Sequence, residues 1–384
     1  AVAAVAALAE ASLVIDAVLG IGGRAGLAGP VALFAASCAD LEVPVLAVDL
    51  PSGLDCDART EGASFQATQS ITFGALKPCH VIQPFAQRCG RVAVADIGIP
   101  VGSTELTAAA PSDIARAWPE PEIMSDKYSR GVVGIDAGSA TYPGAGVLAC
   151  AGAVGAGAGM VRYLGAAPSA LIMQRFPSVV LGEGRVQSLL LGPGWAADPD
   201  ARDKILAAAQ RDVPLVIDAD ALRALPDALG PDPLLTPHAG ELARLLGCER
   251  AAITQDPVGA ARQAAVRYRA TVLLKGATQV VATPCGQATL AVPGPAWTAQ
   301  AGSGDVLAGV CAALLAAGLS AQQAGIMGAS IQAMTAAANP GPRPPDVIAA
   351  AMADQVARLI GLAAEHAVAQ VAVGVEPRQD REHG

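Results

Sequence analysis

A run of small residues that leads into a long apolar segment places one acid where a phosphate group could bind. Ala301-Gly302-Ser303-Gly304-Asp305 leads into a helix predicted over 304–317. Free N–H groups and the dipole at a helix N-terminus attract anions, and glycines let the backbone approach them closely. An acid at that point repels phosphate, but it suits a base that removes a proton from an attacking hydroxyl. The alternative is that Asp305 is an ordinary helix N-cap.

Four further segments carry polar residues or glycines at the ends of predicted strands. They are Leu191–Gly194, the two acids Asp218 and Asp220, Thr236–Glu241 with His238, and Leu274–Gln279 with Lys275. Open α/β sheets place ligands outside the carboxyl ends of their strands, so these segments are candidates for one site. The alternatives are a plain turn for Gly194, a surface histidine for His238 and an ordinary hairpin after Lys275.

Alternating strand and helix signals indicate an α/β fold. Continuous apolar runs predict buried parallel strands, and apolar residues at helical spacing predict helices between them. Strands are expected at 12–20, 43–55, 67–78, 131–137, 187–191, 213–218, 271–274 and 278–283. Helices are expected at 30–40, 144–158, 199–210, 240–247, 256–269 and 304–317.

Proline and glycine between 100 and 125 indicate a boundary between two domains. We expect a first domain over 1–103, a linker over 104–125, a second domain over 126–372 and a frayed tail over 373–384. Each domain is expected to have three α/β/α layers, the first Rossmann-like and incomplete. The first residues hold no basic region of the kind that opens a signal peptide, and they begin within an Ala-rich helix, which is typical of a chain that continues upstream.

Composition excludes several classes of protein. The chain has 384 residues, a net charge of −9 and 53% hydrophobic residues, which excludes intrinsic disorder, and its acidity argues against nucleic acid as a partner. The uncharged runs 137–161 and 306–342 are broken by glycines and polar residues, so they predict buried helices and no membrane span.

Eight scattered cysteines without metal-ligand spacing are typical of reduced, buried thiols, and we expect a cytoplasmic protein. Ala-rich surfaces could pack between subunits, so a homo-oligomer is a further expectation that the sequence leaves open.

Residues 126–365 resemble the ribokinase-like superfamily and, within it, the ADP/ATP-dependent NAD(P)H-hydrate dehydratases. The resemblance lies in TPHAGE (236–241), LKGATQV (274–280), AGSGDVLAG (301–309) and the entry segment over 125–148. Two residues depart from the family pattern: Ala239 stands where proline is usual, and Ala301 where glycine is usual. The same Gly-Ser-Gly-Asp loop occurs in kinases of small alcohols such as vitamin precursors, which is the alternative function.

The resemblance implies roles for individual residues. Those that would bind ADP or ATP are Lys275, Gly276, Ala277, Thr278, Gln279, Gly302, Ser303 and Gly304. Those that would bind the hydrated nicotinamide nucleotide NAD(P)HX are Ala145, Gly194, His238 and Asp305. Asp305 would be the base in phosphorylation of the hydrate hydroxyl, loss of phosphate would restore NAD(P)H, and Mg²⁺ is expected to neutralise the phosphoryl oxygens. The choice between ADP and ATP stays open.

The first hundred residues resemble an NAD(P)H-hydrate epimerase domain through 14–27, 45–55 and 71–80. The resemblance implies that Asp16 and Ser52 bind K⁺. It also implies that substrate is held by Gly20, Ile21, Gly22, Gly23, Arg24, Ala25, Gly26 and Asp49. The alternative for Gly20–Ala25 is a dinucleotide-binding fingerprint. The family's Asn-Asn-Gly-Gly-Asp-Gly loop, upstream of the Asp16 strand, is not among these residues, so we expect these 384 residues to lack epimerase activity.

Overall fold

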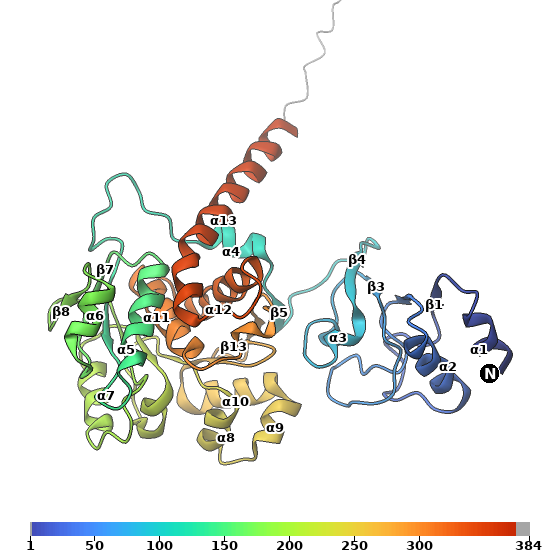
Figure 1. Cartoon of the computed structure of the whole chain (residues 1–384), viewed down its shortest axis with the longest axis horizontal. Helices are drawn as coiled ribbons and strands as arrows, with labels where there is room; N and C mark the ends of the chain where they lie inside the picture. The colour runs from blue at the N-terminus through green and yellow to red at the C-terminus, as the bar shows by residue number, and fades with distance from the viewer. Residues whose placement is uncertain (1, 374–384) are drawn as a thin grey trace, which may run out of the picture. The chain divides into compact units, whose positions relative to one another are not determined.

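The chain forms two compact units, Ala1–Glu105 and Leu106–Gly384. A computed structural model describes residues 2–373, and Figure 1 shows the chain coloured along its length. The predicted tail, 373–384, lies outside the described residues except for Val373, which ends the last helix. The two units are described separately below.

The N-terminal unit is built on a four-stranded parallel sheet of order β1-β2-β3-β4. Its strands are β1 (Val14–Asp16), β2 (Val45–Val48), β3 (Gln69–Phe73) and β4 (Arg91–Ala95). Its helices are α1 (Val2–Leu8), α2 (Gly29–Asp40), η1 (Pro78–His80) and α3 (Ala86–Cys89). Leu8 of α1, with Ala35 and Cys38 of α2, packs on Val45 and Phe65 in a small apolar cluster.

The C-terminal unit contains a ten-stranded sheet of order β5-β14-β13-β12-β11-β10-β9-β6-β7-β8. Its strands are β5 (Leu106–Ala108), β6 (Val132–Asp136), β7 (Met160–Tyr163), β8 (Val180–Leu181), β9 (Ser188–Leu191), β10 (Leu215–Ile217), β11 (Leu234–Leu235), β12 (Thr271–Leu274), β13 (Val280–Ala282) and β14 (Ala288–Leu290). The strands from β8 to β12 run parallel, whereas β13 is antiparallel to β12. Strand order reverses between β6 and β9, the position at which open α/β sheets bind ligands.

Helices cover the sheet of the C-terminal unit (Figure 1). They are α4 (Pro111–Ala117), α5 (Pro143–Gly155), α6 (Ser169–Arg175), α7 (Ala201–Ala209), η2 (Ala219–Ala224), α8 (Ala239–Leu246), α9 (Arg250–Gln255), α10 (Pro257–Tyr268), η3 (Ala296–Thr298), α11 (Ser303–Ala316), α12 (Ala321–Ala338) and α13 (Pro345–Val373). Helices α5, α11 and α12 contact the sheet on the side that α13 covers further out, and α10 contacts β12 and β13. The predicted α/β fold with parallel sheets is confirmed.

Glycines bring α5 and α11 into direct backbone contact. A Cβ atom on Gly152 would lie 2.0 Å from the Val306 carbonyl oxygen, and one on Gly309 would lie 2.0 Å from that of Ala149. Every residue of α11 from Val306 onward is buried, as expected for a helix that is apolar on all sides. The second half of α5 therefore packs against the first half of α11.

The structure differs from the sequence-based prediction between 104 and 125. This predicted linker contains β5, which pairs with β14, and α4, which packs against α13. Pro111 lies in the first turn of α4, where proline is tolerated, and the other prolines of this segment follow the helix. The uncharged run 306–342 forms two helices, α11 and α12, and no described helix is long and apolar enough to cross a membrane.

Candidate active site

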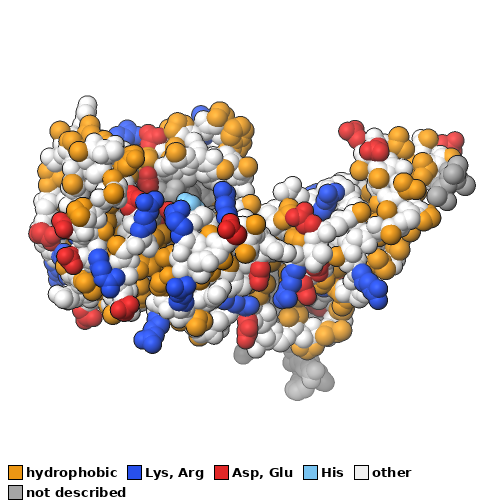
Figure 2. All heavy atoms as spheres, turned by 90° about the horizontal axis from the view of Figure 1, so that it is seen from below, with side chains coloured by type: hydrophobic (Ala, Val, Ile, Leu, Met, Phe, Trp, Pro, Cys, Tyr) orange, Lys and Arg blue, Asp and Glu red, His pale blue; other side chains and the backbone are white. Residues whose placement is uncertain are grey.

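The carboxyl ends of five parallel strands supply the candidate site in the C-terminal unit. Asp136 ends β6, Gly192 follows β9, Asp218 follows β10, Thr236 follows β11 and Lys275 follows β12. All five strands run in the same direction, so these ends share one edge of the sheet. Figure 2 shows a hollow in this unit where acidic and basic side chains meet.

A buried ion pair positions the predicted nucleotide-binding lysine. Lys275 Nζ donates a hydrogen bond of 2.7 Å to Oδ1 of Asp218, whose side chain is 1% exposed. Burial alone would lower the pKa of Lys275, but attraction by Asp218 and Glu241 outweighs it and raises the pKa. A Cβ atom on Gly304 would lie 3.1 Å from Nζ, so glycine at 304 lets the ammonium approach the first turn of α11.

Asp305 lies in the same first turn and has an unusual electrostatic environment. Burial, then repulsion by Asp218, raises its pKa to about 7, although Lys275 acts in the opposite direction. Glu241 and Asp220 add further repulsion. A carboxyl group with a pKa near neutrality can accept a proton and release it at physiological pH, which is what a general base requires.

The start of α11 is shaped to receive an anion beside Asp305. Gly302 caps the helix with φ of +90°, a left-handed conformation that favours glycine. The Ser303 carbonyl accepts a 2.8 Å hydrogen bond from Gln332 Nε2, which fixes the loop to α12. The amides of Gly304 and Asp305 belong to the first helical turn, where N–H groups have no intrahelical acceptor. These amides and Lys275 Nζ therefore supply positive charge at the same place.

His238 lies next to Lys275 but its ring serves the adjacent helix. A parallel bridge joins the two residues, and Lys275 N donates to the Pro237 carbonyl at 2.9 Å. His238 Nδ1 accepts hydrogen bonds from the amides of Gly240 and Glu241, so it caps α8, and Glu241 Oε2 accepts from the His238 amide. The side chain is 55% exposed, and its Nε2 lies 3.4 Å from Glu241 Oε1.

Ala145 and Gly194, the other predicted substrate-binding residues, come together at the strand-order reversal. A Cβ atom on Gly194 would lie 2.6 Å from that of Ala145, and Gly194 has φ of +66°. The Gly138 amide donates to the Pro193 carbonyl at 2.7 Å, which ties the loop after β6 to the loop after β9. Gly192 in turn packs against the Asp218 carbonyl. Asp218 thus connects the predicted nucleotide-binding residues around Lys275 with the predicted substrate-binding residues around Gly194.

The remaining predicted nucleotide-binding residues form the turn between β12 and β13. Gly276 and Ala277 are exposed, whereas Thr278 and Gln279 are half-buried. The Gln279 carbonyl accepts a 3.0 Å hydrogen bond from the Ala291 amide, which fixes the end of the turn to the next strand. This turn follows Lys275 directly and presents accessible backbone beside the ammonium group.

In the N-terminal unit the two predicted K⁺ ligands lie in direct contact. Ser52 donates from its amide to Asp16 Oδ2 at 2.7 Å and from its hydroxyl to Asp16 Oδ1 at 2.6 Å. The Leu19 carbonyl lies 3.2 Å from the same hydroxyl. Both side chains are buried, and this group of hard oxygen donors is the chemistry that an alkali cation prefers.

Asp49 is the other polar centre of the N-terminal unit. Its Oδ1 accepts hydrogen bonds from Lys77 Nζ at 2.8 Å and Thr72 Oγ1 at 2.9 Å. Burial would raise its pKa, but these two hydrogen bonds outweigh burial and lower it, so the carboxylate stays ionised at neutral pH. Its backbone has φ of +73°, a conformation that costs a non-glycine residue free energy.

The predicted glycine loop over 20–26 lies against Asp49. The Ile21 amide donates to Asp49 Oδ2 at 3.3 Å, and a Cβ atom on Gly20 would lie 3.3 Å from the same oxygen. Gly23 donates to the Gly20 carbonyl at 2.8 Å, which tightens the loop. Gly22, Arg24 and Gly26 are exposed and Ala25 is half-buried, so these residues contact the carboxylate less directly.

Although three acids lay in candidate segments, sequence reasoning assigned no specific role to several residues that the structure places at the two centres. They are Asp218, Asp220 and Glu241 around Asp305, and Thr72, Lys77 and His80 around Asp49. The two acids that end the predicted strand over 213–218 were a usable signal, since charged residues seldom follow a buried strand without a partner. Lys77 carried no comparable signal in the sequence.

Comparison with known families divides the chain in the same way. The family described as NAD(P)H-hydrate dehydratase matches residues 133–352, and the family described as YjeF-related protein N-terminus matches residues 2–79. Solved structures resemble the C-terminal unit in fold. An ADP/ATP-dependent NAD(P)H-hydrate dehydratase from Bacillus subtilis, co-crystallised with ATP/Mg²⁺, superposes with a TM-score of 0.61 at 23% identity over 68% of this chain and 99% of that one. A ribokinase-like superfamily protein from Enterococcus faecalis gives a TM-score of 0.60 at 18% identity over 68% and 99%.

Curated relatives extend over both units. The bifunctional NAD(P)H-hydrate repair enzyme Nnr of Mycobacterium leprae is 42% identical over 351 residues, which is 87% of this chain and 72% of that protein. The enzyme of the same name from Moorella thermoacetica is 36% identical over 358 residues, covering 84% and 68%. With a matched dehydratase family over more than half its length and relatives of this similarity, the chain belongs to the bifunctional NAD(P)H-hydrate repair enzymes.

Proposed function

We propose that the C-terminal unit converts (S)-NAD(P)HX into NAD(P)H at the expense of ADP or ATP. The observation that carries the proposal is Asp305, a carboxyl group with a pKa of about 7 in the first turn of α11, beside the Lys275 ammonium. A kinase-like loop that retains both a base and an anion hole suits phosphoryl transfer to a hydroxyl.

In this reaction Asp305 accepts the proton of the hydrate hydroxyl as its oxygen attacks the terminal phosphorus of the nucleotide. The bond from that phosphorus to the bridging oxygen breaks, and AMP or ADP leaves. The amides at the start of α11 and the Lys275 ammonium stabilise negative charge on the transferring group. Phosphate then departs from the nicotinamide ring and a ring proton is lost, which restores the double bond of NAD(P)H. Phosphate leaves more easily than hydroxide, which explains the use of a nucleotide.

Mg²⁺ fits the chemistry of the carboxylates around Asp305. Asp220 and Glu241 supply oxygen donors, the ligand type that Mg²⁺ prefers. Bound with the nucleotide, Mg²⁺ would neutralise charge on the phosphoryl oxygens. The exposed turn over 276–279 would contact the adenine nucleotide, whereas Ala145, Gly194 and His238 would contact NAD(P)HX.

For the N-terminal unit we propose a K⁺ site at Asp16 and Ser52 and a substrate site at Asp49 and the loop over 20–26. The direct contact of Asp16 with Ser52, and of the Ile21 amide with Asp49, supports this assignment. In the bifunctional relatives this unit would interconvert the R and S epimers of the hydrate, so that the C-terminal unit receives the epimer it accepts. The eight free cysteines suit a reducing compartment, and we propose a cytoplasmic location.

The dehydration assay tests the proposal. The chain is mixed with NADHX, ADP and Mg²⁺, and the NADH absorbance band is followed, with a parallel reaction in ATP. We expect the band to recover in a nucleotide-dependent manner. An unchanged band, together with ADP formation from ATP and a small alcohol such as a vitamin precursor, would instead establish a kinase.

A further inference from the structure

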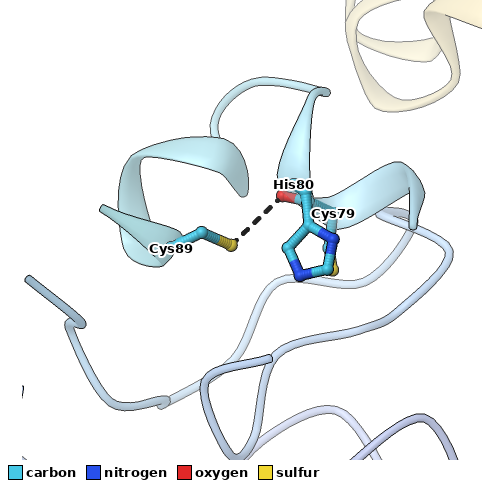
Figure 3. Close-up of side chains that lie close together, drawn as sticks. All are labelled: Cys79, His80 and Cys89. Carbon is cyan, nitrogen blue, oxygen red and sulfur yellow. Dashed lines mark hydrogen bonds between the residues drawn. The ribbon is translucent and has the colours of Figure 1, made fainter. Parts of the chain in front are cut away.

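Three cysteines and a histidine meet in the N-terminal unit, away from the Asp16–Ser52 contact. The Sγ atoms of Cys79 and Cys89 and a ring nitrogen of His80 lie within 4.8 Å of one another (Figure 3). The Cys56 thiol forms a hydrogen bond with that of Cys79, and the Cys79 amide donates to the Cys56 carbonyl at 3.0 Å. We call these four residues the thiol cluster.

The thiol cluster is enclosed, unlike an accidental group of surface thiols. Cys79 and Cys89 are 0% exposed, His80 is 6% exposed, and Cys56 is half-buried. Cys89 Sγ lies 3.5 Å from the Cys79 carbonyl, so the end of α3 faces η1 (Figure 3). Separate segments, the loop after β2 and the η1–α3 region, thus converge on one point.

The donor types and spacing match one class of ligand. Three sulfurs and one imidazole nitrogen form the Cys₃His set of structural zinc sites, with Zn–S of about 2.3 Å and Zn–N of about 2.0 Å. Tetrahedral geometry at those bond lengths separates the donors by about 3.5–3.8 Å. The donor atoms of Cys79, Cys89 and His80 lie within 4.8 Å of one another, so shifts of roughly 1 Å bring these three to that separation. Cys56, which is hydrogen-bonded to Cys79, is the neighbouring residue that would complete the set.

Zinc binds cysteine as the thiolate, so a divalent cation at the thiol cluster would replace the thiol protons and release them.

The hydrogen bonds of His80 assign the ring nitrogens. Its Nε2 lies 3.0 Å from the Asp49 carbonyl and donates to it, which is the second contact that metal-bound histidines usually make. Its Nδ1 accepts from the Lys77 amide at 3.0 Å. Ligation through Nδ1 would exchange this hydrogen bond for a coordinate bond while keeping the contact with Asp49.

We propose that the thiol cluster is a structural Zn²⁺ site, with three thiolates as the principal ligands and His80 as the fourth. An ion there would fasten the turn over 77–80 directly behind Asp49, whose backbone conformation is strained. It would thereby hold the Lys77 ammonium and the Asp49 carboxylate in contact.

Cobalt provides the direct test. The full chain, reduced and freed of metal with a chelator, is titrated with Co²⁺, and thiolate-to-cobalt absorbance is recorded before Zn²⁺ is added. We expect one equivalent of Co²⁺ to give this absorbance with tetrahedral d–d bands and to release protons, and one equivalent of Zn²⁺ to abolish both absorption features. Absence of the thiolate band in the wild-type protein would overturn the proposal.

Variants locate the site. Cys89→Ser and Cys56→Ser are each expected to lower Zn²⁺ affinity at least tenfold, measured against a chelating dye, and to reduce thiolate-to-cobalt intensity by about one third, in proportion to the ligands lost. Cys248→Ser and Cys285→Ser remove exposed thiols elsewhere and should change neither quantity. Circular dichroism confirms that each variant folds, and Cys56→Ser, at the half-buried position, is the one that perturbs packing least.

Two results with these variants would overturn the proposal. Equal Zn²⁺ affinity in wild type and in both cluster variants would place the metal elsewhere and overturn the proposal. A disulfide in the cluster would also overturn the proposal. It would appear as six free thiols in the denatured wild-type protein purified without reductant and eight after reduction. Cys89→Ser or Cys56→Ser, purified in the same way, would then still have at least six free thiols.

Discussion

The two units hold their central carboxylates in opposite states. Asp305 in the C-terminal unit has its pKa raised to about 7 by burial and by repulsion from Asp218. Asp49 in the N-terminal unit has its pKa lowered, because hydrogen bonds from Lys77 and Thr72 outweigh burial. Each carboxylate has a lysine nearby, but only Lys77 bonds directly to its acid, whereas Lys275 is bonded to Asp218 instead.

The two environments suit different chemical roles, ligand binding and proton exchange. A carboxylate that is satisfied by direct partners stays ionised and can hold a ligand or orient it. A carboxylate that is buried among other acids, with its lysine committed elsewhere, exchanges a proton near neutral pH. The following predictions, in order of expected effect, test whether this contrast reflects function.

The largest effect should follow removal of the base in the C-terminal unit. Asp305→Asn keeps the shape of the side chain but cannot accept a proton, so NADHX turnover should fall by about 10²–10⁴-fold. Nucleotide binding, measured by calorimetry, should persist because the amides and Lys275 remain. Turnover within a factor of three of wild type would remove Asp305 from the base role.

Breaking the buried ion pair should have the next largest effect. Asp218→Asn leaves the Lys275 ammonium buried without its carboxylate, which should lower the free energy of unfolding by about 3–5 kcal/mol. Urea unfolding of the C-terminal unit measures the change. Glu183→Gln is the control, because its pair with Arg211 is exposed and should contribute at most about 1 kcal/mol. Equal losses in both variants would show that the buried pair has no special role.

Close packing of α5 and α11 positions the start of α11 and should be sensitive to one methyl group. Gly152→Ala places Cβ 2.0 Å from the Val306 carbonyl oxygen and should destabilise the unit by about 1–3 kcal/mol. Gly144→Ala in the same helix meets nothing within 4 Å and should be neutral or slightly stabilising. The midpoints of thermal unfolding compare them, and equal midpoints would refute this account of the helix contact.

How much of this was predictable from sequence depends on the range of the interactions. The strand over 271–274 and the helix beginning near Ser303 follow from local apolar patterns and appear where they were expected. The two-residue strand β11 is too short to leave a pattern. The Lys275–Asp218 pair depends on the order of strands in the sheet, which no local pattern encodes. The meeting of Cys56 with Cys79 has the same cause, since it joins the loop after β2 to η1.

The smallest effect on dehydration should come from the N-terminal unit. Ser52→Ala deletes a hydroxyl bonded to the buried Asp16 carboxylate and should lower the stability of that unit by about 1.5–3 kcal/mol, measured by hydrogen exchange. The rate of dehydration of purified (S)-NADHX should not change. A parallel loss of that rate would show that the two carboxylate centres do not act separately.

The pH dependence of dehydration tests the central claim most directly. The base must be ionised to act, so kcat/KM for (S)-NADHX should be full above the pKa of Asp305 and fall as the pH drops through about 7. Asp218→Asn removes the strongest like charge, so it should move this acidic limb to lower pH. A limb near pH 7 that shifts downward in Asp218→Asn is the predicted result. A profile that stays flat from pH 8 to pH 5 in the wild-type enzyme would contradict the assignment of Asp305 as the base.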